Sequence, residues 1–148
     1  MRSKASGRPL MMAALFGSVL LSMPVTAAES NDKNTGLPLH PGLTFQQEVG
    51  SPVCGHKAQM DLYDAPGTAT LAEYVSWYKE HLKGFHAVHK VWSKRAQELF
   101  YNPDGSNAVG LTGSVSGPGV FAVSYMKMSV KLTNHQMDAF DPSNPTCK

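Results

Sequence analysis

The chain has 148 residues, of which 42% are hydrophobic and 16% charged, a balance that suits one globular domain with a single core. Its 13 basic and 11 acidic side chains give a formal net charge of +2, but Arg2, Lys4 and Arg8 lie in a segment that we expect to be removed. Without these three, 10 basic and 11 acidic side chains remain. We therefore expect no nucleic-acid partner, which would need clustered Lys and Arg.

The first 27 residues have the three parts of a secretory signal peptide. A basic start precedes an apolar run over residues 10–23, and Val25-Thr26-Ala27 places small side chains before the expected cleavage site. The apolar run is shorter than the roughly 20 residues that cross a bilayer, so we expect no stable membrane insertion after cleavage. The sequence therefore predicts a periplasmic or secreted protein, with a flexible polar leader over residues 28–41 and one domain over residues 42–148.

Two strands are predicted at the start of the domain. Apolar side chains alternate with polar ones over residues 43–49 and again over residues 58–63. Gly50-Ser51-Pro52 predicts the end of the first strand, and the Asp-Ala-Pro-Gly sequence at residues 64–67 predicts a turn after the second.

A helix is predicted over residues 71–83. Thr70 and Glu73 have the spacing of a capping box, in which each side chain bonds an amide of the first helical turn. Gly84 is a suitable residue to end the helix, because glycine adopts the left-handed backbone conformation without a Cβ clash. Apolar side chains recur with helical spacing and define the face expected to be buried: Leu71, Tyr74, Val75, Tyr78 and Leu82.

The remaining strands are predicted to form a meander, followed by a tail without regular structure. The turn Asn102-Pro103-Asp104-Gly105 is the clearest hairpin motif of the chain. In the last strand we expect Met126, Met128 and Val130 to lie on one face and to pack against the helix. The fold class is therefore α+β: an antiparallel sheet of five to six strands with one amphipathic helix on one face. The strands are expected over residues 85–92, 97–101, 107–115 and 120–132.

A motif in the helix resembles one found in small exported bacterial proteins of unknown function. It has the form V-x-W-Y-K-x-x-L-x-G and runs here from Val75 to Gly84. The resemblance covers about half of the mature chain. It implies a strand, a helix and a β-meander, and it carries no catalytic residue to this sequence.

The only two cysteines, Cys54 and Cys147, are predicted to form a disulfide, because an even cysteine count in an exported protein favours pairing. The alternative is a reactive or metal-binding thiol at Cys54, with His56 two residues away.

Methionine and histidine suggest one metal hypothesis. Met126 and Met128 lie two residues apart on one strand face, and His135 and Met137 follow soon after. Thioether and imidazole groups suit copper in an exported protein. The competing interpretation, which we favour, places Met126 and Met128 in the hydrophobic core.

The sequence contains no motif that names a reaction, a catalytic residue or a cofactor. The aromatic side chains outnumber what one helix and one sheet face must bury, so Trp77, Trp92 and Tyr101 are predicted to contribute to a partner surface. The leading interpretation is a non-catalytic binding domain for an unknown protein or small ligand. The alternatives are a copper-handling or metal-sensing protein and a small hydrolase.

Overall fold

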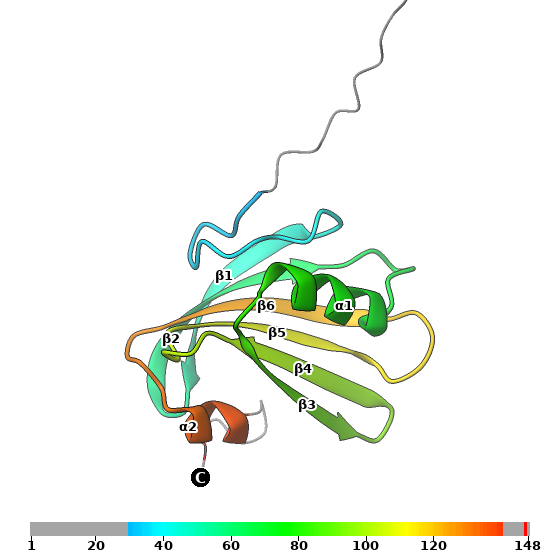
Figure 1. Ribbon diagram of the computed structural model, residues 1–148. Helices are drawn as coiled ribbons and strands as arrows, with labels where there is room; N and C mark the ends of the chain where they lie inside the picture. The colour runs from blue at the N-terminus through cyan, green and yellow to red at the C-terminus, as the bar shows by residue number, and fades with distance from the viewer. Residues whose placement is uncertain (1–29, 141–146, 148) are drawn as a thin grey trace, which may run out of the picture.

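The computed structural model describes residues 30–140 and Cys147, and the predicted signal peptide lies outside this part of the chain. One antiparallel sheet has the strand order β1-β2-β6-β5-β4-β3, which confirms the predicted α+β class (Figure 1). Within the described residues, no helix is long and apolar enough to cross a membrane. The elements are β1 (Thr44–Val53), β2 (His56–Asp64), α1 (Leu71–His81), β3 (His86–Trp92), β4 (Arg95–Tyr101), β5 (Asn107–Ser114), β6 (Val120–Met128) and α2 (Asn134–Ala139).

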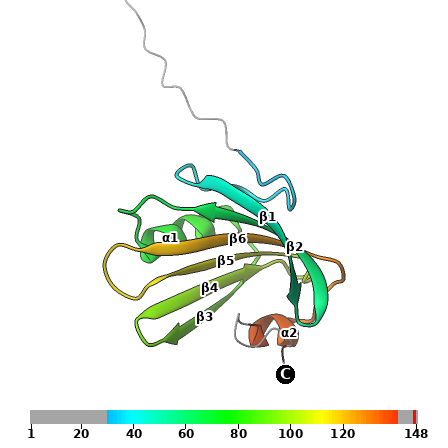
Figure 2. The same ribbon diagram turned by 180° about the vertical axis from the view of Figure 1, so that it is seen from behind.

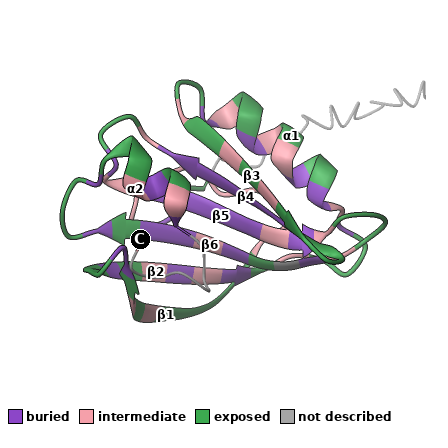
Figure 3. Ribbon diagram, turned by 90° about the horizontal axis from the view of Figure 1, so that it is seen from below, coloured by how far each residue is buried: buried purple, intermediate pink, exposed green. Residues whose placement is uncertain are grey.

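The last strand, β6, joins the β1–β2 hairpin to strands β3, β4 and β5 in one sheet. The meander from β3 to β6 brings β6 back beside β2, so β6 is hydrogen-bonded to β2 on one side and β5 on the other. The central strands are accordingly the most buried, and β1 and β3 form the exposed edges (Figure 3). β1 runs through residues 50–52, which we had predicted to end it, because all three pair with β2.

The long helix covers one face of the sheet and begins with the expected Thr70–Glu73 capping box. Its buried side chains pack against Val123 and Tyr125 of β6. The expectation that Met126, Met128 and Val130 face this helix is wrong. The two methionines belong to the core on the opposite face, and Val130 lies beyond the end of β6 and is 42% exposed. Both faces of β6 carry apolar residues, so its alternation does not reveal which of them meets α1.

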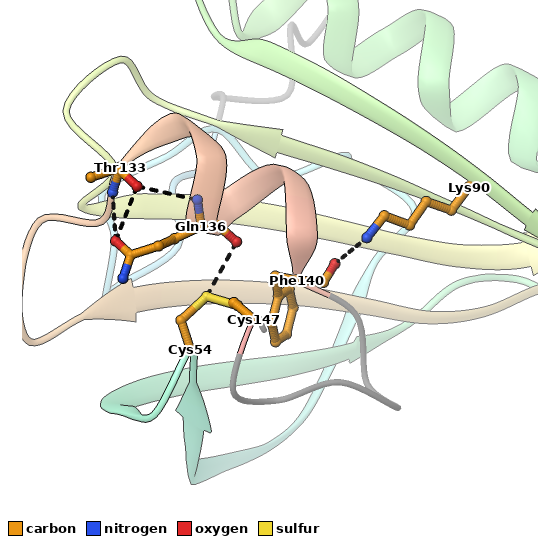
Figure 4. Close-up of a disulfide and its surroundings, with 6 residues drawn as sticks. All are labelled: Cys54, Lys90, Thr133, Gln136, Phe140 and Cys147. Carbon is orange, nitrogen blue, oxygen red and sulfur yellow. Dashed lines mark hydrogen bonds between the residues drawn. A yellow bond between two sulfur atoms is a disulfide. The ribbon is translucent and has the colours of Figure 1, made fainter.

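The opposite face is covered by α2, in a tail that we had predicted to lack regular structure. Thr133 and Gln136 form a second capping box, and Met137 is fully buried against the sheet. The predicted disulfide is present: Cys54, at the end of β1, bonds Cys147, and their Cα atoms are 4.8 Å apart (Figure 4). The bond thereby ties the end of the chain to the first hairpin.

The expected flexible leader instead packs onto the α1 face of the sheet. Asp32 is almost fully buried, and its Oδ1 accepts a hydrogen bond of 2.7 Å from the Tyr63 hydroxyl. The Tyr125 hydroxyl donates to the Pro38 carbonyl oxygen at 2.5 Å, and the His40 ring stacks on Tyr74. The polar and Gly/Pro composition of this segment therefore reflects turns and specific hydrogen bonds.

Candidate functional site

A groove of about 790 Å³ lies between α1 and the β3–β4 hairpin. The helix lies over β5 and β6, whereas the hairpin extends past it (Figure 1), so part of the β3–β4 face has no helix above it. Residues 114–117, in and before the β5–β6 turn, line the groove together with Thr70 and Leu71 at the start of α1. A groove of this volume is in the range of sites that hold small molecules.

The groove is mainly apolar, and two of its side chains are unusually exposed. Leu71 and Val75 of α1 and Ala96 of β4 form its walls and floor. Val91 and Val115 are 58% and 49% exposed, although burial would be favourable for both. Apolar surface left open beside a concavity is a feature of binding sites.

One titratable pair lies within this apolar surface. His89 of β3 and Glu98 of β4 are direct partners in the strand register, and His89 Nδ1 lies 2.6 Å from Glu98 Oε2. The Glu98 side chain is only 7% exposed, whereas that of His89 is 56% exposed. A buried carboxylate needs a partner, and an ionised one only accepts hydrogen bonds, so Nδ1 donates and Nε2 is left as the second polar atom of the ring.

Helix α1 adds a positive charge to the groove. Lys79 lies one helical turn after Val75 on the same side of α1, so it lines the groove and its ammonium group is exposed. Together with the Glu98–His89 pair, Lys79 completes the charged groups that line this groove.

The three aromatic residues predicted as a partner surface do not lie together. Trp77, on α1, is half-buried and stacks on His81 with ring centroids 3.7 Å apart. Trp92 is exposed on the edge strand β3. Tyr101 is only 2% exposed, and its hydroxyl donates to Asp138, so its assignment to a surface is wrong. Tyr101 belongs to the core beneath α2, since its side chain points to the face opposite α1.

The residues of the copper hypothesis are divided between core and surface. Met126, Met128 and Met137 are buried in the same cluster beneath α2, whereas His135 is exposed on that helix. Among the residues that the structure describes, no three or more His, Cys, Asp or Glu side chains are placed to hold a metal ion.

A second buried charged cluster lies at the other side of the α1 face. Burial raises the pKa of Asp61 to about 6, and hydrogen bonding to Asp32 together with the charges of Asp32 and Glu48 adds to this shift. The Oδ1 atom of Asp61 is buried without a hydrogen-bond partner. Asp61 is therefore part of the contact between the N-terminal segment and the sheet.

Neither His89 nor Glu98 was predicted from the sequence as a site residue. One feature of the sequence points to Glu98: it shares a strand face with Ala96 and Phe100, so a charged residue interrupts an apolar stripe. A buried glutamate then requires a partner on a neighbouring strand.

No family model, no curated protein and no solved structure matches the chain.

Proposed function

We propose that this protein is an exported, non-catalytic binding domain that holds a small, mainly apolar molecule in the groove between α1 and the β3–β4 hairpin. The observation that carries the proposal is the groove itself: about 790 Å³, apolar walls, and a single His–Glu pair among them. Small-molecule sites typically combine a concave apolar surface with a few polar groups that orient the ligand.

Export is supported by two independent features of the chain. The first 27 residues have the pattern of a cleaved signal peptide. The Cys54–Cys147 disulfide is of a kind that persists in oxidising compartments and is rare in the cytosol. Both features are consistent with a periplasmic or secreted binding protein.

Binding of a neutral apolar fluorescent probe, N-phenyl-1-naphthylamine, tests the proposal. Its emission should increase on binding to the purified protein and should saturate. Ala72→Phe places a ring in the groove from the exposed side of α1, so it should abolish the increase without lowering the unfolding temperature. Glu80→Phe puts the same ring on α1 outside the groove lining and should bind the probe normally. Equal binding by both variants, or no binding by the unmodified protein, contradicts the proposal.

A small hydrolase is the second candidate, and one observation favours it. A carboxylate that orients a histidine is the arrangement used for general-base catalysis, and Ser93 lines the same groove as His89 and Glu98. Hydrolysis of p-nitrophenyl octanoate that is lost in both His89→Ala and Ser93→Ala would establish this activity. Turnover unchanged by either substitution, or none above buffer, would reject it.

A further inference from the structure

Lys79 and His89 lie at the same end of the groove. Along α1, Lys79 is eight residues from Leu71, a rise of about 12 Å. Along β3, His89 is three residues from Trp92, about 10 Å in an extended strand, and Ser93 follows Trp92 in the turn. Lys94, which follows Ser93, accepts a hydrogen bond from Val115 through its carbonyl oxygen, and Thr70 pairs with Pro118. Leu71 and Ser93 therefore lie near one end of the groove, beside the β5–β6 turn, and Lys79 and His89 lie near the other.

The end beside the turn offers little to a charged ligand. Thr70 Oγ1 accepts from the Glu73 amide, and the Glu73 carboxylate accepts from the Thr70 amide, so an acidic side chain already caps the first turn of α1. The Ser114 hydroxyl donates to the Ser116 carbonyl oxygen. Leu71 and Val115 supply apolar surface at this end.

At the end of the groove away from the β5–β6 turn, Lys79 supplies a positive charge and His89 supplies a ring that can form hydrogen bonds. The Glu98 side chain also lines the groove, but it is only 7% exposed and is hydrogen-bonded to His89, so the 56% exposed imidazole is the more accessible group. Lys79 has no ion-pair or hydrogen-bond partner among the described residues, and it lines the groove beside apolar residues. An unpaired ammonium group beside an apolar surface favours an anion attached to an apolar body.

We propose that the ligand of this groove is a small carboxylic acid with an apolar chain or ring, whose carboxylate binds Lys79 and whose apolar part extends toward the β5–β6 turn. This inference rests on the proposed function, because it names the class of molecule that the same groove holds. The carboxylate accepts hydrogen bonds from the Lys79 ammonium group. The distance of about 12 Å along α1 from Lys79 to Leu71 leaves room for a medium-length acyl chain.

Displacement of the neutral probe by three matched compounds tests this class. Octanoate, octanol and octylammonium share one apolar chain and differ in the charge of the head group. Octanoate should displace the probe at a concentration at least tenfold lower than octanol, and octylammonium should be the poorest competitor. The unfolding temperature of each variant below should stay unchanged, because Lys79 is exposed.

Variants at Lys79 assign the preference to this groove. Lys79→Gln should make octanoate and octanol equal, and Lys79→Glu should make octylammonium the best competitor. Lys83→Gln removes an exposed charge that does not line the groove and should leave the order unchanged. Equal displacement by octanoate and octanol, or an order insensitive to Lys79, overturns the carboxylate inference while the groove remains a binding site. Absence of probe binding in the unmodified protein removes the proposed function as well.

Discussion

Two buried carboxyl groups show how a polar residue can hold two parts of this chain together. Asp32 accepts from the Tyr63 hydroxyl and from the amide and hydroxyl of Thr35, so its negative charge has three donors. Asp61, beside it, is 3% exposed and has one oxygen without a partner. Burial and the nearby Asp32 and Glu48 carboxyl groups therefore favour the protonated form of Asp61 and raise its pKa to about 6.

The raised pKa of Asp61 predicts a pH-dependent stability. The folded state binds the proton more tightly than the unfolded chain, whose aspartate has a pKa of about 3.9. The contribution of Asp61 is therefore greatest below pH 4 and is lost as the pH rises toward 6. Asp61→Asn, which resembles the protonated acid in shape, should raise the free energy of unfolding at pH 7 by on the order of 1–3 kcal/mol.

Urea denaturation at pH 4, 5, 6 and 7 measures this effect. The advantage of Asp61→Asn over the unmodified protein should grow across that range. Asp64→Asn, at the exposed end of β2, should change the stability little at any pH. An Asp61→Asn variant that is less stable than the unmodified protein at pH 7 would show that the Asp61 carboxylate is stabilising.

At the scale of elements, local sequence patterns predicted the strands and α1. The face of β6 that meets α1 and the position of α2 depend instead on contacts between residues far apart in sequence. The Thr70–Glu73 capping box and the helical spacing of apolar residues depend on neighbours in sequence, and both were predicted. The face of β6 that meets α1 depends on which face α2 covers, and α2 itself was missed. Its Thr133–Gln136 capping box was present in the sequence, but the element has only 6 residues and little periodicity.

The candidate groove could be predicted even less well than the fold. Its two defining residues, His89 and Glu98, lie on different strands and meet only through the β3–β4 register. Their types and positions were visible in the sequence, but their pairing requires the hairpin alignment. The third residue, Lys79, has the ordinary appearance of a solvent-facing helix residue. The binding role that we propose for Lys79 depends on the uncovered β3–β4 face opposite it.

The disulfide links these elements, and its removal should be costly. The bond joins cysteines 93 residues apart in sequence and ties the chain end beyond α2 to β1 (Figure 4). Loop-closure entropy predicts that Cys54→Ser/Cys147→Ser lowers the free energy of unfolding by about 4–5 kcal/mol. Denaturant unfolding should show this loss, and the unmodified protein with reductant should match the variant. A midpoint unchanged by reduction would mean that α2 and the buried contacts of Met137 hold this end without the bond.

At the scale of the whole molecule, covering segments occupy both faces of one sheet. The N-terminal segment and α1 cover one face, and α2 with Cys147 lies on the other, as the front and back views show (Figure 1 and Figure 2). The β3–β4 hairpin extends past α1, and the groove forms there. The position of the candidate site therefore follows from the length of α1 and its placement over β5 rather than from any one motif.

The N-terminal segment should behave as part of the folded domain. A chain that begins at Leu43 loses two half-buried leucines, Leu37 and Leu39, and the hydrogen bonds of Tyr63 and Tyr125 to this segment. The free energy of unfolding should fall by roughly 2–5 kcal/mol at pH 7. A chain that begins at Ser30 keeps every one of these contacts and should match the unmodified protein in urea denaturation.

Loss of this segment should also change the pH dependence. Without Asp32, the Asp61 carboxyl group loses a negative neighbour and gains solvent, so its pKa should move back toward the ordinary value of about 3.9. The chain that begins at Leu43 should then show little of the change in stability between pH 4 and pH 6 that Asp61 gives the longer chain. Identical denaturation midpoints for the two chains at pH 7 would mean that residues 30–42 contribute nothing to the fold. A Leu43 chain that is destabilised but keeps the full pH dependence would instead assign that dependence to Glu48 and to burial of Asp61 within the sheet.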